Sequence, residues 1–125
     1  METARAFYAA LDRKDMTAAI ALLDRDVRWV TPDGLVWAQG PYVGIQALKD
    51  YFARIGALMT DFSVEIEELL HCGDRVLAIG REQGTVRATG RRFSAPCAHL
   101  LRCSSGQIND LVGFIDTALV KRAFD

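Results

Sequence analysis

The spacing of apolar residues along the chain changes close to residue 60. Before this point, apolar side chains recur every three or four positions, which places them on one face of a helix. After it they recur every second position, which places them on one face of a strand. The first half of the chain therefore predicts helices, and the second half predicts a sheet.

Three helices are predicted in the first half. The first covers residues 2–14, with an apolar side formed by Ala6, Phe7, Ala10 and Leu11. Asp15 is suited to cap a second helix over residues 16–23. A third helix is predicted over residues 45–59 from the spacing of Ile45, Leu48, Phe52, Ile55 and Met59.

The segment between the second and third helices contains a short strand and a loop. Residues 27–32, VRWVTP, have the composition of a strand that ends at Pro32. Residues 33–44 contain three glycines and a proline, which favour a loop.

The second half predicts a meander of four antiparallel strands. From Phe62 onward, apolar and polar residues alternate, and the chain turns at residues 72–74, 89–91 and 104–106, each of which includes a glycine. Asp116 then caps a closing helix over residues 117–124. The order of elements predicts one α+β domain over residues 1–125, with a curved antiparallel sheet wrapped around a long helix.

Charge and composition limit the classes of partner. The formal net charge of the 125 residues is −1, and acidic and basic residues are interspersed, so we expect no nucleic-acid partner. The N-terminus has no unbroken apolar run, which argues against a signal peptide or a membrane span and makes a cytoplasmic location the expectation. With two histidines and three cysteines that form no CxxC pair, we expect reduced thiols and neither a metal ion nor an organic cofactor.

Strand phase selects the polar residues that we expect inside the fold. Leu77 and Ile79 share a face with Arg81 and Gln83. In the next strand, His99 shares a face with four apolar or small residues, Phe93, Ala95, Cys97 and Leu101. If the apolar residues point inward, Arg81, Gln83 and His99 point into the interior as well.

A buried arginine needs a partner, because an unpaired charge in an apolar interior costs several kcal/mol. Arg81 either pairs with Glu68, the carboxylate that the strand pattern places inward, or waits for the carboxylate or enolate oxygen of a ligand, or is turned out to solvent by a bulge. His99 is either a core histidine or a ligand donor and proton carrier. Trp29, Trp37 and Tyr51 are core or ligand-contacting residues, and the glycine-rich loop around Trp37 could place it over a cavity mouth.

Three segments resemble the nuclear transport factor 2 fold superfamily, specifically its SnoaL-like and ketosteroid-isomerase-related branch. They are FYAALDRKDMTAAIALLDRDVRWVTPDG, GIQALKDYFARI, and TGRRFSAPCAHLLRCSSGQI followed by FID. The resemblance implies a cone-shaped α+β barrel with a deep apolar cavity, dimerised through the outer face of the sheet. On that outer face we expect Val76, Ala78, Val86 and Ala88, which are apolar or small.

The resemblance also implies which site positions have changed. The isomerases' oxyanion tyrosine and general-base aspartate fall on Phe7 and Thr31, and the cyclases' acid/base aspartate falls on Gly113. The arginine of the related hydrolases is kept at Arg81, whereas their aspartate falls on Gln83. The cyclases' pocket histidine matches His99.

These observations predict a SnoaL-like protein that binds a small apolar molecule with a carboxylate or carbonyl end. His99 and Arg81 are the candidate catalytic residues for proton transfer of the isomerase, cyclase or dehydratase type. The candidate ligand-contacting residues are Phe7, Trp29, Thr31, Trp37, Tyr51, Gln83 and Gly113. The alternative is a module that binds or sequesters such a molecule without catalysis, and a third is a protein-interaction scaffold with a collapsed cavity.

Overall fold

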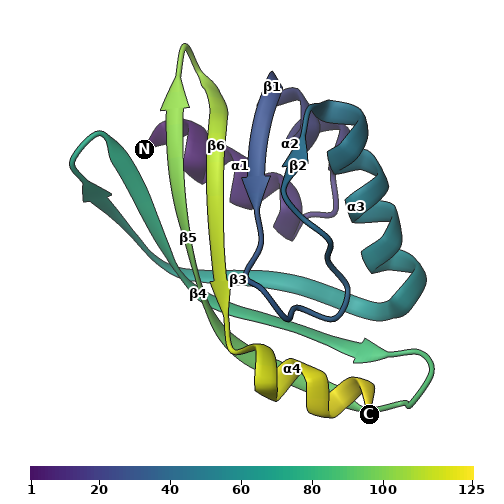
Figure 1. The fold of residues 1–125 in the computed structure, drawn as a ribbon. Coiled ribbons are helices and arrows are strands. Elements are labelled where there is room, and N and C mark those ends of the chain that lie inside the picture. The colour runs from purple at the N-terminus through teal and green to yellow at the C-terminus, as the bar shows by residue number, and fades with distance from the viewer.

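The computed structural model describes residues 1–125 as an α+β fold with one curved, unclosed sheet (Figure 1). The sheet has six strands in the order β2-β1-β6-β5-β4-β3. In Figure 1, α1, α2 and α3 lie together on one side of the sheet, and α4 follows the end of β6. The predicted α+β class with a curved sheet is confirmed, but the sheet is mixed rather than wholly antiparallel, because β1 pairs with β6 in parallel.

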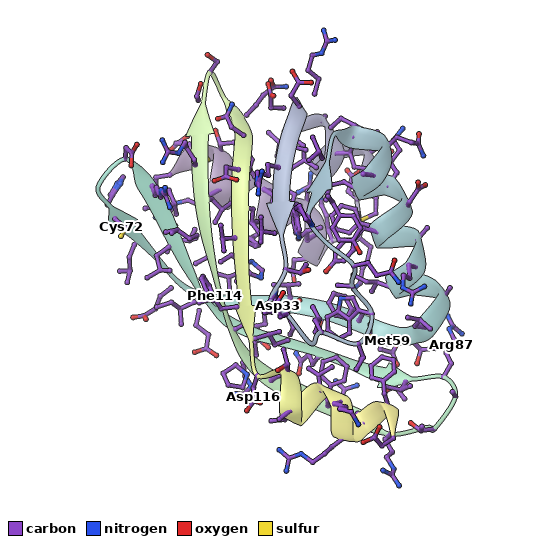
Figure 2. The ribbon with its side chains drawn as sticks, viewed as in Figure 1. Asp33, Met59, Cys72, Arg87, Phe114 and Asp116 are labelled. Carbon is purple, nitrogen blue, oxygen red and sulfur yellow. The ribbon has the colours of Figure 1, made fainter.

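The helices follow the predicted caps. They are α1 (Glu2–Asp12), α2 (Met16–Ala21), α3 (Ile45–Leu58) and α4 (Thr117–Phe124). The Asp15 side chain accepts a hydrogen bond from the Ala18 amide, and the Asp116 side chain accepts one from the Leu119 amide. Figure 2 shows Asp116 at the start of α4. Both aspartates therefore satisfy amide donors that the first turn of a helix leaves free.

The four strands of the predicted meander are present, and two further strands complete the sheet. The meander consists of β3 (Met59–Cys72), β4 (Arg75–Val86), β5 (Arg92–Ser104) and β6 (Gln107–Ile115). β1 (Leu23–Val30) starts earlier than the predicted strand at residues 27–32, because Leu23 already pairs with Ile108 of β6. β2 (Tyr42–Val43) is a short edge strand inside the predicted loop.

The core lies between the helices and the inner face of the sheet. Ala4, Phe7, Tyr8 and Ala10 of α1 are buried there, whereas Ala6, which was predicted on the buried side, is exposed. The buried residues of α1 thus follow the i, i+3, i+4 spacing that begins at Ala4. No helix of this structure is long and apolar enough to cross a membrane.

The predicted inward face of β4 is wrong. Val76, Ala78 and Val86 are buried and point to the core, and Gly80 and Gly84 lie in the same phase. These positions pair with the inward residues of β5: Ala78 with His99, Gly80 with Cys97, and Gly84 with Phe93. Leu77, Ile79, Arg81 and Gln83 therefore occupy the outer face, because neighbouring residues of a strand point to opposite sides.

Apolar residues cover part of the outer face of the meander. Leu70, Leu77, Leu100 and Val112 are direct neighbours in one row across β3, β4, β5 and β6. The adjacent row contains Glu68, Ile79, Ala98 and Phe114. Val76, Ala78 and Val86 were predicted on this face but lie in the core, and Ala88 lies beyond the end of β4. We define the outer apolar rows as six residues: Leu70, Leu77, Leu100, Val112, Ile79 and Phe114.

The close contact of β3 with Gly80 leads to a stability prediction. A Cβ atom at Gly80 would lie 1.9 Å from the carbonyl oxygen of Glu65 and 2.8 Å from the Cα of Ile66, both backbone atoms. We expect Gly80→Ala to lower the free energy of unfolding by about 3 kcal/mol, because the two strands must separate locally. Urea denaturation followed by circular dichroism measures this loss.

Gly56→Ala is the matched control for this prediction. Gly56 lies in α3, and a Cβ atom there meets nothing within 4 Å. We expect this variant to gain about 0.5–1 kcal/mol of stability, because alanine is the better helix former. Equal stability of the two variants would contradict the described contact between β3 and β4.

Candidate functional site

The main cavity lies between the helices and the inner face of the sheet. Its volume is about 210 Å³, and 21 residues line it, 13 of them hydrophobic. A cavity of roughly 150 Å³ already admits a molecule of the size of benzene. α1, α3, β1 and all four strands of the meander contribute to its wall, so the site depends on the complete fold.

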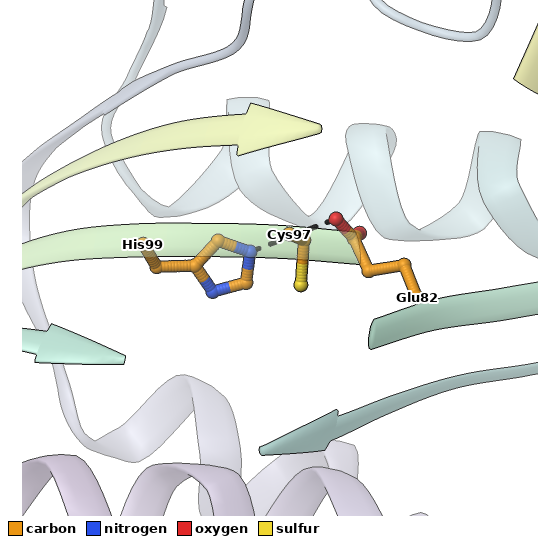
Figure 3. A group of neighbouring side chains, drawn as sticks. All are labelled: Glu82, Cys97 and His99. Atoms are coloured by element: carbon orange, nitrogen blue, oxygen red, sulfur yellow. Dashed lines mark ion pairs between the residues drawn. The ribbon is translucent and has the colours of Figure 1, made fainter. Parts of the chain in front are cut away.

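The polar side chains of this wall include Lys14, Thr31, Tyr51 and Ser63, and two further ones lie close together. His99 of β5 and Glu82 of β4 both line the cavity, and their side chains are 8% and 12% exposed. His99 Nε2 lies 3.7 Å from Glu82 Oε2. Figure 3 shows the imidazole and the carboxylate pointing toward each other, with Cys97 between them. The arrangement is an acid/base pair inside a mostly apolar cavity.

Tyr8 of α1 binds the other nitrogen of the imidazole. Its hydroxyl lies 2.7 Å from His99 Nδ1, and both groups are buried. Burial raises the pKa of Tyr8 well above its ordinary value, and the negative charges of nearby groups, Glu82 among them, add to this effect. The direction of this bond depends on the tautomer: Tyr8 donates to Nδ1 when the imidazole hydrogen lies on Nε2, directed at Glu82, and accepts from Nδ1–H when Nε2 is free to take a proton.

Cys97 completes the cluster. Burial raises the pKa of Cys97 to about 12, and the charge of Glu82 and a hydrogen bond with it add to this effect. Glu82, Cys97 and His99 place their donor atoms within 4.8 Å of one another, so the interior offers three potential metal ligands. A closed zinc site uses four ligands, one more than this cluster supplies. We therefore describe the cluster as a hydrogen-bonding and proton-transfer group.

Six of the predicted site residues line the cavity together. They are Phe7, Trp29, Thr31, Tyr51, His99 and Gly113. Phe7 and Trp29 contact each other with ring centroids 6.1 Å apart, and Trp29 also packs against Tyr51. The structure thus gathers residues from α1, β1, α3, β5 and β6 around one space.

Arg81 and Gln83 do not line the cavity. Arg81 donates from Nε to the Ser94 hydroxyl at 2.8 Å and from Nη2 to the Ser94 carbonyl at 2.9 Å. Gln83 donates to Glu65 at 3.2 Å. Their predicted inward orientation is wrong, because Glu82 occupies the inward position between them. Glu68, one of the alternatives for the partner of Arg81, is opposite Ile79 on the same outer face.

Trp37 is a core residue and does not cover the cavity mouth. It is fully buried and packs against Phe62, Phe93 and Phe124. Its Nε1 donates a hydrogen bond of 3.0 Å to the hydroxyl of Tyr51, which lines the cavity. Trp37 therefore positions a wall residue. The expectation of a collapsed interior, which belonged to the scaffold alternative, is wrong as well.

The sequence pattern missed Glu82 and Tyr8. Glu82 was placed outward because Leu77 and Ile79 are the large apolar residues of β4, whereas the inner face carries small ones. The pairing of β4 with β5 could have placed Glu82 correctly. Residues opposite the inward Phe93 and Ala95 must also point inward, and Glu82 is opposite Ala95. Tyr8 follows from the spacing of Ala4, Phe7, Tyr8 and Leu11 in α1.

Comparisons with known proteins agree with this geometry. A sequence model described as the SnoaL-like domain matches residues 4–111. A comparison with curated protein sequences gives no match. The crystal structure of a nuclear transport factor 2-like protein from Burkholderia thailandensis is 31% identical, covers 99% of this chain and 95% of its own, and superimposes with a TM-score of 0.93.

Two more distant structures contain small molecules. TerC, co-crystallised with polyporic acid, is 22% identical, with a TM-score of 0.88 over 98% of this chain and 95% of its own. A protein with a ketosteroid isomerase-like fold from Catenulispora acidiphila, in complex with trimethylamine, is 21% identical, with a TM-score of 0.83 over 98% and 91%. At these identities the likeness shows a shared fold.

The curved sheet, the enclosing helices and the apolar interior define a protein of the nuclear transport factor 2-like class. Within this class the chain belongs to the SnoaL-like family, because the family model covers most of its length.

The raised pKa of Cys97 leads to a chemical prediction. With a pKa of about 12, only about 10⁻⁴ of Cys97 is thiolate at pH 8, and the thiolate is the reactive form. We expect iodoacetamide to modify exposed Cys72, which Figure 2 shows at the tip of the β3–β4 hairpin, and to leave Cys97 unmodified in the folded protein. Peptide mass spectrometry measures both sites, and Cys97 reacting as fast as Cys72 would contradict its described environment.

Proposed function

We propose that this protein binds a compact apolar molecule with a carbonyl end in its cavity and transfers a proton next to that carbonyl. The observation that carries this proposal is the His99–Glu82 pair, which faces the cavity with its nitrogen and oxygen atoms 3.7 Å apart. The two small-molecule complexes of the same fold support a ligand-binding cavity. The chemistry belongs to the isomerase, cyclase or dehydratase type.

The structure favours a carbonyl end over a carboxylate end. The sequence offered Arg81 as the group that would bind a carboxylate, but Arg81 lies on the outer face with Ser94. Inside the cavity the ligand meets Glu82, and two carboxylates placed close together repel each other. A carbonyl group has no net charge and avoids this repulsion, and its oxygen can accept a hydrogen bond from the Nε2–H that His99 carries once it has taken the proton.

Each polar group has a separate task in this proposal. In the tautomer whose hydrogen lies on Nδ1 and is donated to Tyr8, His99 can take the proton from the carbon next to the carbonyl at Nε2. Glu82 stabilises the imidazolium that forms, and Tyr8 holds the ring through Nδ1. Return of the proton to a different atom completes an isomerisation, and delivery to a departing hydroxyl group completes a dehydration.

Binding without catalysis is the second candidate. Three wall positions favour it, namely Phe7, Thr31 and Gly113. In the resembling enzymes these positions hold acids, bases and an oxyanion donor, and here they hold residues without such groups. In that case the His99–Glu82 pair only orients a ligand.

Proton exchange on simple ketones distinguishes these functions. In D₂O, we expect the protein to accelerate deuterium incorporation next to the carbonyl of compact cyclic ketones such as cyclohexanone, followed by NMR. His99→Gln keeps a hydrogen-bonding group but cannot carry a proton, so we expect a loss of about 10²–10⁴ in the exchange rate. Glu82→Gln should also slow exchange, because the imidazolium loses its counter-charge.

The chain offers a matched control for each variant. His71 and Glu67 are exposed residues of β3, so His71→Gln and Glu67→Gln make the same chemical changes away from the cavity. Both should exchange at the wild-type rate. If the His99→Gln variant still binds the ketone and exchanges it as fast as wild type, the catalytic function is excluded and the binding function remains.

We also propose that two copies of the chain associate through the outer apolar rows. Leu70 and Phe114 of these rows are 45% and 54% exposed in the single chain. An apolar sheet face that water would otherwise cover is usually buried against another surface. This proposal keeps the dimer expected from the sequence but replaces the residues that form it.

A charge in the middle of the rows tests this association. Leu100→Arg introduces a cation between Leu77 and Val112, and we expect the dimer to dissociate in sedimentation velocity at micromolar concentration. Val43→Arg is the control, because Val43 is 59% exposed on the edge strand β2, outside the rows. A monomeric wild-type protein, or a Leu100→Arg variant that stays dimeric, contradicts the proposed interface.

A further inference from the structure

The cavity wall carries one carboxylate and one ammonium group, and only the carboxylate is in the interior. Glu82 is this carboxylate, and the arginine nearest in sequence, Arg81, lies on the opposite face of β4. Lys14 also lines the cavity, but it is exposed and its ammonium group donates to the Phe62 carbonyl. The groups that surround Glu82, the Tyr8 phenol, the Cys97 thiol and the His99 imidazole, are neutral when His99 carries one hydrogen.

The charge of Glu82 extends across the cavity. Burial is the main cause that raises the pKa of Tyr8, Cys97 and Tyr51, and the negative charge of Glu82 raises each of these values further. The three groups lie on α1, β5 and α3, so the field reaches several walls of the interior. In an apolar cavity such a field is weakly screened and favours a ligand of opposite charge.

Aromatic rings line the same space. Phe7, Trp29, Tyr51, Phe52 and Phe62 all belong to the cavity wall. They pack against one another largely edge to face, with the Trp29 and Phe52 centroids 5.6 Å apart at 90°. The faces of aromatic rings are electrically negative and attract cations, ammonium groups with methyl substituents in particular.

We propose that the ligand of this cavity carries a compact ammonium group, a protonated or quaternary amine, held by the Glu82 carboxylate and the surrounding rings. This inference deepens the proposed function and rests on its ligand-binding cavity. It names the substrate class as small amine-bearing carbonyl compounds and excludes carboxylic acids. In the proposed reaction one oxygen of Glu82 binds the ammonium group, while Oε2, 3.7 Å from His99 Nε2, remains the counter-charge of the imidazolium that forms.

A series of three ligands with equal shape and different charge tests this inference. Choline is the cation. The neutral analogue is 3,3-dimethylbutan-1-ol (dimethylbutanol), in which a carbon atom replaces the nitrogen of choline. The anion is 3,3-dimethylbutanoate (dimethylbutanoate). Isothermal titration of the wild-type protein in the presence of EDTA should give at least about tenfold tighter binding of choline than of dimethylbutanol, and the weakest binding of dimethylbutanoate. This ranking needs no variant.

Glu82→Gln isolates the charge. In this variant we expect the preference for choline to fall to at most about twofold while the affinity for dimethylbutanol is retained, which also shows that the cavity is intact. Glu67→Gln, the same change on exposed β3, should keep the wild-type preference. A preference for choline that survives Glu82→Gln overturns the assignment of the ammonium site to this carboxylate.

The remaining outcomes also decide the question. If dimethylbutanol binds as tightly as choline, the ammonium inference fails, whereas the proposed apolar binding cavity stands. If none of the three ligands binds, both fail. Glu82, Cys97 and His99 could instead hold a metal ion, so one equivalent of zinc retained by purified wild-type protein and lost in Glu82→Gln overturns the inference, because the carboxylate would then belong to the metal.

Discussion

The shape of this protein depends on the close contact between β3 and β4 at Gly80. The register of these strands shifts between Ile66 and Glu68, and the Glu65 carbonyl occupies the place where a side chain at Gly80 would begin. Such an irregularity increases the local bend of a sheet. The bend makes one face of the sheet concave, and the helices enclose that face (Figure 1). The cavity is the space that remains between them.

The same constraint determines which side chains reach the cavity. Because the inner face of β4 is close to β3, it carries the small residues Ala78, Gly80 and Gly84, and the larger Leu77 and Ile79 lie outside. Glu82 is the long side chain of this inner face, and the register brings it beside His99. One strand therefore supplies both the close packing of the sheet and the charge of the site.

The position of the Glu82 charge decides which ligands suit the cavity. Members of this fold class hold different chemistries on one scaffold, so residues of the site decide the function. Here Phe7, Thr31 and Gly113 contribute apolar or small surfaces, and the acid/base capacity resides in Glu82, His99 and Tyr8. A carboxylate and an imidazole enclosed by aromatic rings suit proton transfer and the recognition of a cation, and they disfavour an anionic ligand.

The sequence by itself determined the α+β class, the caps at Asp15 and Asp116, the four-strand meander and the inward position of His99, because periodicity and capping act over a few neighbouring residues. Only the tertiary structure decided the face of β4, the start of β1 and the burial of Trp37. Each depends on contacts between residues far apart in the chain: Gly80 with Glu65, Leu23 with Ile108, and Trp37 with Phe93. For this reason Arg81, rather than Glu82, was the residue that the pattern predicted inside the cavity.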